Sequence, residues 1–306
     1  MIGRAETAFP QHLPNEQVDV RYDSDRGVYW ALMCPKSRPC FSLQLLDELG
    51  CFIKNIKSSF PDQSRHPSPV SYGVLASKIP GVFNLGGDLS LFRALIQVQD
   101  RNSLLDYGKR CIDNLYAWHR NCDGPMTSIA LVQGEALGGG FEAALSASVL
   151  ISEESSRFGF PEILFNLFPG MGAFSFLSRK IGRRAAEEMI VSGTIYSARQ
   201  LYDLGVIDVI TPDGTGEAAV HSFVQKHSKN IGGRQAFERA RNAVSPVTED
   251  ELMRVVEIWA DTALKLQERD LKVMDRLIRA QLRSVQPAEG AEASNVYPLH
   301  AVGGNI

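Results

Sequence analysis

Several kinds of sequence feature are missing from this chain, and each absence excludes a class of protein. No apolar run reaches the roughly 18 residues that predict a membrane-spanning helix, and the opening MIGRAETAFPQHLPNEQ lacks the hydrophobic stretch of a signal peptide. Neither sign of charge dominates, because the formal net charge is −3, so no polyanion such as nucleic acid is indicated as a partner. We therefore expect a cytoplasmic protein with no membrane span.

Cysteine and histidine are sparse and scattered. The five cysteines are odd in number and far apart, which argues against a disulfide framework in a chain of 306 residues. Cys34 and Cys40 bracket PKSRP, but this spacing does not match a common zinc knuckle. The six histidines are isolated, and the chain has no G-x-S-x-G elbow. We therefore predict no metal site, no cofactor and no serine nucleophile.

What the chain does contain is a repeated order of strand, glycine turn and helix. This order favours an α/β fold in which the strands lead into a shared site. Strands are expected over 17–34 as a hairpin with its turn at 23–27, and over 70–75, 81–85, 127–133 and 149–152. Helices are expected over 41–56 with Ser42 as the cap, over 89–120 with a bend near 100–103, and over 141–148.

The chain after about residue 214 has a different pattern, because amphipathic helical segments follow one another up to about residue 283. We therefore divide the chain into an N-terminal arm (1–16), a catalytic core (17–213) and a C-terminal helical region (214–286) that serves assembly and covers the pocket. The last residues, 287–306, have low hydrophobicity and no period, and are expected to form a flexible tail.

Three segments carry the residues that suit chemistry: NLGGDL at 84–89, GEALGGGFEAAL at 134–145 and FGFPEILFNLFPGMG at 158–172. A triple glycine before a helix leaves backbone N–H groups free, with the helix dipole behind them, and this arrangement stabilises negative charge. GGGFEA lacks the G-x-G-x-x-G spacing of a dinucleotide loop. Two facing turns could hold one oxygen between the amides of Leu85 and Gly139.

These three segments together resemble the enoyl-CoA hydratase/isomerase (crotonase) superfamily, over about residues 20–285. The resemblance implies a crotonase-type spiral of ββα units with a C-terminal helical extension. It implies that Glu142 and Glu162 are the catalytic acid and base and that the Leu85 and Gly139 amides form an oxyanion hole. The glycines of the two turns, Gly86, Gly87 and Gly138, would contact the substrate. Outside this context, each glutamate could be only a favourable residue at the start of a helix.

One segment departs from the usual pattern of fatty-acid oxidation hydratases. Where these enzymes commonly read PGxGGTQRL, the chain reads PGMGAFSFL, which replaces polar and basic residues by Phe174, Ser175 and Phe176. With Phe160, Leu164, Phe165, Leu167, Phe168 and Met171 nearby, this segment could form a deep slot for a long acyl chain, or could simply be core.

The whole pattern is similar to the diffusible signal factor synthases of Gram-negative bacteria. This resemblance implies dehydration of a 3-hydroxyacyl group on acyl carrier protein, followed by thioester hydrolysis to a cis-2-unsaturated fatty acid signal. It also implies Met171, Trp259 and Leu277 in the acyl pocket, a homotrimer or hexamer, and binding of a sensor kinase's receiver domain. Two alternatives stay open, namely a hydratase or isomerase acting on acyl-CoA and a non-catalytic scaffold that binds a sensor.

Overall fold

The computed structural model describes residues 16–60 and 70–283, so all but the last residue of the expected arm, and the expected tail, lie outside the described residues. The described chain contains two β-sheets. In the larger one, β1 and β2 are antiparallel and the following strands are parallel. Its order is β1 (Val18–Asp23), β2 (Val28–Met33), β3 (Tyr72–Ser77), β5 (Thr127–Val132), β7 (Val149–Glu153) and β10 (Val209–Thr211).

The smaller sheet is built from strands of three residues. Strands β4, β6 and β8 are parallel neighbours, and β9 pairs with β8 in the antiparallel sense. The order is β4 (Val82–Asn84), β6 (Glu135–Leu137), β8 (Arg157–Gly159) and β9 (Ile195–Ser197). Strands this short carry no readable alternation, which is why only β4 was predicted from the sequence.

The connection between the two sheets repeats three times. The chain passes from β3 to β4, from β5 to β6 and from β7 to β8, and each pair of strands leads into helical structure. Each repeat therefore places one strand in each sheet, so the expected spiral of ββα units with C-terminal helices is confirmed. Because β4, β6 and β8 lie side by side and parallel, the loops at their carboxyl ends meet at one edge of the small sheet.

Eleven α-helices are described, and their caps agree with the sequence. The Ser42 side chain accepts a hydrogen bond from the Leu45 amide, and Asp100 caps the second half of the bent helix predicted over 89–120. The helices are α1 (Leu43–Ser59), α2 (Leu89–Gln97), α3 (Arg101–His119), α4 (Gly139–Ser146), α5 (Ala173–Ile181), α6 (Arg183–Ser192), α7 (Ala198–Asp203), α8 (Gly216–His227), α9 (Ile231–Val244), α10 (Glu249–Ala263) and α11 (Glu268–Arg283). Short 3-10 turns cover Asn121–Asp123, Pro161–Phe165 and Ser228–Asn230.

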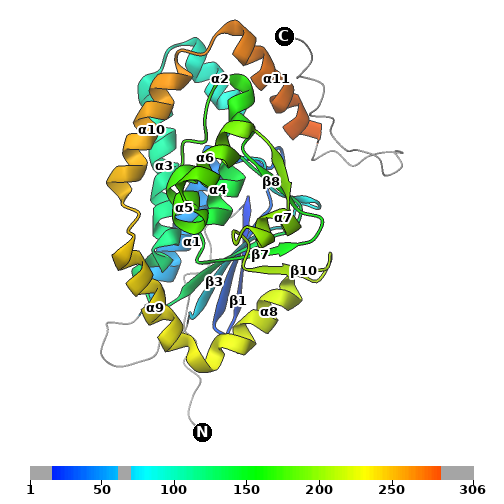
Figure 1. Cartoon of the computed structure of the whole chain (residues 1–306), viewed down its shortest axis with the longest axis vertical. Helices are drawn as coiled ribbons and strands as arrows, with labels where there is room; N and C mark the ends of the chain where they lie inside the picture. The colour runs from blue at the N-terminus through cyan, green and yellow to red at the C-terminus, as the bar shows by residue number, and fades with distance from the viewer. Residues whose placement is uncertain (1–15, 61–69, 284–306) are drawn as a thin grey trace.

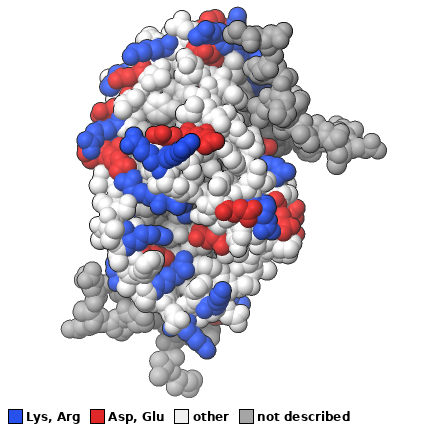
Figure 2. Space-filling model, in the orientation of Figure 1, with Lys and Arg blue, Asp and Glu red and all other residues white. Residues whose placement is uncertain are grey.

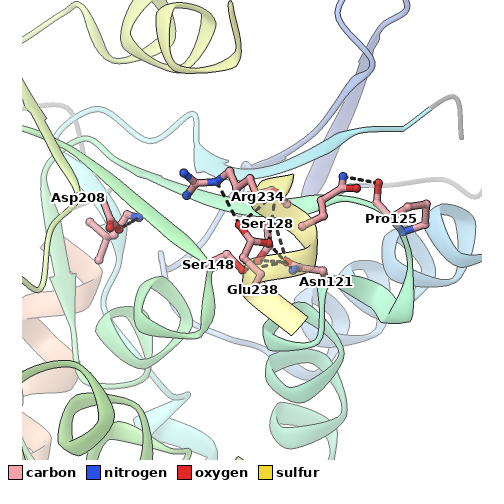
Figure 3. Close-up of polar contacts among 10 residues, drawn as sticks. Asn121, Pro125, Ser128, Ser148, Asp208, Arg234 and Glu238 are labelled. Carbon is pink, nitrogen blue, oxygen red and sulfur yellow. Dashed lines mark hydrogen bonds and ion pairs between the residues drawn. The ribbon is translucent and has the colours of Figure 1, made fainter. Parts of the chain in front are cut away.

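The C-terminal helices α8 to α11 run around the outside of the core (Figure 1). Helix α9 is anchored by Glu238, which is 3% exposed and bonds to Asn121 and Thr127 as well as to Arg234 of its own helix. The Asn121 side-chain oxygen in turn accepts from Ser128, which ties this helix to the ends of two core strands (Figure 3). Because the group is buried and mutually hydrogen-bonded, it serves as a structural anchor.

The surface shows no dominant charge. On the face drawn in Figure 2, basic and acidic side chains are interspersed, and neither sign forms a continuous patch. Within the described residues, no helix is long and apolar enough to span a membrane. The same residues contain no group of three or more His, Cys, Asp or Glu placed to hold a metal ion.

Candidate active site

The three sequence segments meet where the strands of the small sheet end. Strand β4 leads into Leu85 to Asp88, β6 leads into the three glycines that open α4, and β8 leads into the 3-10 helix that carries Glu162. Their side chains and backbone line one cavity of about 870 Å³. The structure thus brings together Glu142 and Glu162, predicted from separate motifs.

Glu142 lies in the first turn of α4 and is 1% exposed. Its Oε1 accepts hydrogen bonds from the amides of Met171 at 2.7 Å and Ala173 at 2.9 Å, where the Gly170–Gly172 turn enters α5. Burial raises the pKa of Glu142 to about 7, and the two amide bonds oppose that rise because they favour the ionised form. The PGMG turn therefore positions this carboxyl and moderates its pKa.

Glu162 has a different environment. Its Oε2 is fully buried and has no hydrogen-bond partner among the described residues. Burial, together with the negative charge of Glu142, raises the pKa of Glu162 to about 8. Its Oε1 lies against Gly138, which has φ +51°, and a Cβ at that position would overlap this oxygen. The glycine is thus required both for the turn and for the space that Glu162 occupies.

The backbone amides around the cavity correct one prediction. The Leu85 amide donates to the Pro39 carbonyl at 2.7 Å, so it is already paired and does not face Gly139. Within the described residues, the amides of Gly87 and Gly139 donate to no other group. A Cβ built on Gly139 would lie 3.5 Å from the Gly87 nitrogen, so these two glycines are neighbours. Gly87, rather than Leu85, is the free donor beside Gly139.

The deep part of the cavity is apolar and comes from helices that the sequence did not associate with the site. Helix α1 contributes Leu46, Leu49, Phe52 and Ile53, and helix α3 contributes Tyr107, Cys111, Asn114, Leu115 and Trp118. Both helices have an ordinary amphipathic pattern, which predicts burial but does not distinguish a cavity wall from solid core. Only the arrangement of α1 and α3 in the folded chain shows that their apolar faces enclose a cavity.

The predicted pocket residues divide into two groups. Met171, Trp259 and Leu277 line the cavity as expected, and so do Leu164, Phe165 and Leu167. Gly87 and Gly138 line it too, whereas Gly86 is not among the lining residues. Phe160, Phe168, Phe174, Ser175 and Phe176 are not among the lining residues.

Packing and exposure explain why three of these five residues do not form the slot. Phe160 stacks on Phe141 with ring centroids 4.9 Å apart, and Phe176 packs on His119 at 5.2 Å. Phe174 faces outward and is 38% exposed. The apolar character of the PGMGAFSFL segment therefore belongs largely to the core and the surface.

A cysteine nucleophile finds no support here. Burial raises the pKa of Cys40 to about 12, and it raises the pKa of Cys111, which lines the cavity, further still. A thiol with such a pKa stays protonated at neutral pH and is a poor nucleophile. Glu142 and Glu162, whose pKa values lie near 7 and near 8, are instead suited to proton transfer close to neutral pH.

The chain matches known proteins over most of its length. The family model for enoyl-CoA hydratase/isomerase covers residues 33–275. The enoyl-CoA isomerase/hydratase fer4 of Mycosarcoma maydis is 34% identical over 256 residues, which cover 80% of this chain and 86% of that protein. The fatty acid oxidation complex subunit alpha of Vibrio cholerae is 26% identical over 202 residues, covering 65% of this chain but only 27% of that longer protein.

Solved structures agree on the fold. Human mitochondrial delta3-delta2-enoyl-CoA isomerase superposes with a TM-score of 0.72 at 18% identity, covering 87% of this chain and 98% of that one. The extent of the family match, together with the fer4 relative, shows that the chain belongs to the enoyl-CoA hydratase/isomerase family.

Proposed function

We propose that this member of the family dehydrates a long 3-hydroxyacyl thioester and then hydrolyses the product to a free cis-2-enoic acid of the diffusible signal factor type. The observation that carries the proposal is a pair of cavity-lining carboxyls, the buried Glu142 and the half-buried Glu162, with pKa values near 7 and 8 on one largely apolar cavity. Two interacting carboxyls titrate as a pair, and at a pH between their two pKa values the pair holds on average one proton.

In the dehydration step, the ionised member of the pair removes the proton from C2 of the acyl chain. The C–H electrons move onto the thioester oxygen, whose negative charge is held by the amides of Gly87 and Gly139. The protonated member then gives its proton to the 3-hydroxyl, which leaves as water while the C2–C3 double bond forms. One preorganised donor at such an oxygen is typically worth about 10²–10³ in rate.

The proton has by then moved from one glutamate to the other, and this prepares the hydrolysis. The carboxylate left by the first step removes a proton from water, and the oxygen of that water bonds to the thioester carbon. The resulting oxyanion occupies the same two amides, and the C–S bond breaks as the carbonyl reforms. The protonated glutamate supplies a proton to the departing thiol.

The cavity supports a long acyl chain as substrate. Its volume of about 870 Å³ lies near the upper end of the roughly 300–1,000 Å³ usual for ligand pockets. The rings of Phe52 of α1 and Trp118 of α3, both almost fully buried, line it. An acyl chain that reaches these rings would be desolvated along its length, which favours long chains over short ones.

The direct test is incubation of the purified protein with 3-hydroxydodecanoyl acyl carrier protein, followed by mass spectrometry of the released acid. We expect free cis-2-dodecenoic acid from the native protein and none from the Glu142→Gln, Glu162→Gln double variant. Rapid hydration of crotonyl-CoA without any released acid would instead assign the chain to acyl-CoA metabolism and refute the signal-synthase function.

Two further properties proposed by resemblance have their own tests. Assembly as a trimer or hexamer is measured by sedimentation of the native protein. Binding of a sensor kinase's receiver domain is measured by titration with the isolated domain.

Full signal production in cells by the Glu142→Ala, Glu162→Ala double variant would support a scaffold role instead of catalysis.

A further inference from the structure

Gln281, near the end of α11, reaches the turn that leads to the free amide of Gly87. Its side chain is 4% exposed and lines the same cavity as Glu142 and Glu162. Its Nε2 donates to the Leu85 carbonyl at 3.0 Å, although the two residues are 196 positions apart. Helix α11 also contacts α2 and the 3-10 helix that carries Glu162, which holds Gln281 in place.

The hydrogen bond fixes which way the carboxamide points. A backbone carbonyl can only accept, so the NH₂ group must face Leu85 and the Oε1 atom must face away from it. This Oε1 is buried and has no hydrogen-bond partner in the described part of the chain. A buried carbonyl oxygen without a partner is unfavourable, so a donor from water or from a ligand is expected at this atom.

A second buried oxygen without a partner lies on the same cavity. Glu162 Oε2 is also buried and unpaired within the described residues. Both oxygens are offered by side chains that line the cavity, one from the core and one from the C-terminal helix. The Gln281 amide oxygen can only accept, so it calls for a ligand that carries polar hydrogens, and an acyl thioester carries them in its 3-hydroxyl group and in the amide N–H groups of its pantetheine arm.

We propose that Gln281 is a substrate-binding residue, whose Nε2 braces the Leu85 turn and whose Oε1 accepts a hydrogen bond from an O–H or N–H group of the acyl thioester. This inference rests on the proposed function, because it needs an acyl thioester in the cavity. It adds a polar contact from α11 to the substrate site, in which Trp259 of α10 and Leu277 of α11 supply apolar contacts.

The test compares two variants of this residue. Gln281→Met keeps the length of the side chain but removes both polar atoms, whereas Gln281→Glu keeps an acceptor oxygen at the same place. Leu282→Met is the matched control, because the neighbouring Leu282 is 46% exposed on the same helix and does not line the cavity. Thermal unfolding of each variant checks that α11 stays folded.

Binding is measured by calorimetry with two thioethers that the enzyme cannot turn over, 3-hydroxydodecyl-CoA and dodecyl-CoA. Loss of one buried hydrogen bond should raise the Kd of Gln281→Met by about 5- to 20-fold. If the Kd of Gln281→Met rises for 3-hydroxydodecyl-CoA alone, Oε1 bonds to the 3-hydroxyl group. If the Kd rises equally for both thioethers, Oε1 bonds to a pantetheine N–H group. Gln281→Glu and Leu282→Met should bind within about 3-fold of the native protein.

Two results overturn the proposal. Unchanged Kd values in Gln281→Met would show that Oε1 contacts no ligand. An equal loss in Gln281→Met and Gln281→Glu would show that only the brace on Leu85 matters. Failure of the proposed function is seen separately, because the native protein would then release no acid from the carrier-protein substrate, whether or not it binds the thioethers.

Discussion

The two active-site glutamates keep their protons to a higher pH than solvated carboxyls do, and this sets the pH range in which they can act together. With pKa values near 7 for Glu142 and near 8 for Glu162, the pair lacks a base below the first value and lacks an acid above the second. We therefore expect kcat/KM for 3-hydroxydodecanoyl-CoA to rise with pH through about 7 and to fall above about 8.

The measurement is kcat/KM across about pH 5.5 to 9.5, the range that brackets both limbs. Glu135→Gln is the matched control, because Glu135 also lines the cavity and burial also raises its pKa. This variant should keep both limbs. A flat native profile, or a limb that disappears in Glu135→Gln, would remove Glu142 and Glu162 from the proton transfers.

Gly86 protects the free amide of Gly139 from obstruction. It has φ +94°, and a Cβ there would lie 3.0 Å from the Gly139 nitrogen. We expect Gly86→Ala to lower kcat by about 10²–10³, the typical cost of losing one oxyanion donor. Gly81→Ala is the control, since Gly81 has φ +72° but no atom within 4 Å of its Cβ position. An equal loss of kcat in both variants would attribute the effect to backbone strain alone.

Residue identities in the site could be predicted, but the direction of a backbone amide could not. Glu142 and Glu162 were predicted through the resemblance of their segments to the enoyl-CoA hydratase/isomerase family, and both line the cavity. The resemblance implied the Leu85 amide as the partner of Gly139, and the sequence carries no signal that the Pro39 carbonyl already pairs with that amide. That bond depends on a tertiary contact between segments 46 positions apart.

At the scale of elements, α1 and α3 line the part of the cavity in which we propose that the acyl chain lies. Leu115 of α3 is 9% exposed and lines the deep cavity. We expect Leu115→Trp to fill the slot and to lower kcat/KM for a dodecanoyl substrate at least about 10-fold relative to a butanoyl substrate. Leu105→Trp is the control, because Leu105 lies on the same helix away from the cavity. Equal losses for both chain lengths in Leu115→Trp would contradict a chain-length role.

Helix α9 has one buried side chain among the described residues, the carboxylate of Glu238. Glu238→Ala leaves Asn121 and Arg234 without their partner in a buried site, and we expect a loss of about 2–4 kcal/mol in the free energy of unfolding. Urea denaturation measures it. Glu187→Ala is the control, because the exposed Arg183–Glu187 pair should contribute less than about 1 kcal/mol. Similar losses in both variants would mean that the buried network is not an anchor.

At the scale of the whole molecule, the C-terminal helices cover the cavity of their own chain. Trp259 of α10 and Gln281 of α11 line the cavity together with residues of the core. An amphipathic period predicts that such helices exist and which face is buried, but not which surface they cover. The sequence therefore predicted the helices over 214–283, whereas the contact between Gln281 and Leu85 required the folded chain.

This arrangement predicts where a bound acyl chain changes local stability. A ligand in the cavity would contact α1, α3, α10 and α11. These helices could then unfold locally only after the ligand dissociates. Their amide hydrogen exchange should therefore slow by up to about 100-fold at ligand concentrations near 100 times Kd. Helix α8 packs through Phe223 and His221 on Tyr72 and Trp30, in a cluster separate from the cavity, and should be unaffected. Hydrogen exchange with and without dodecyl-CoA thioether measures both regions. Equal slowing in α8 and α11 would show a general stabilisation of the fold, and no change in α11 would mean that the C-terminal helices do not enclose the acyl chain.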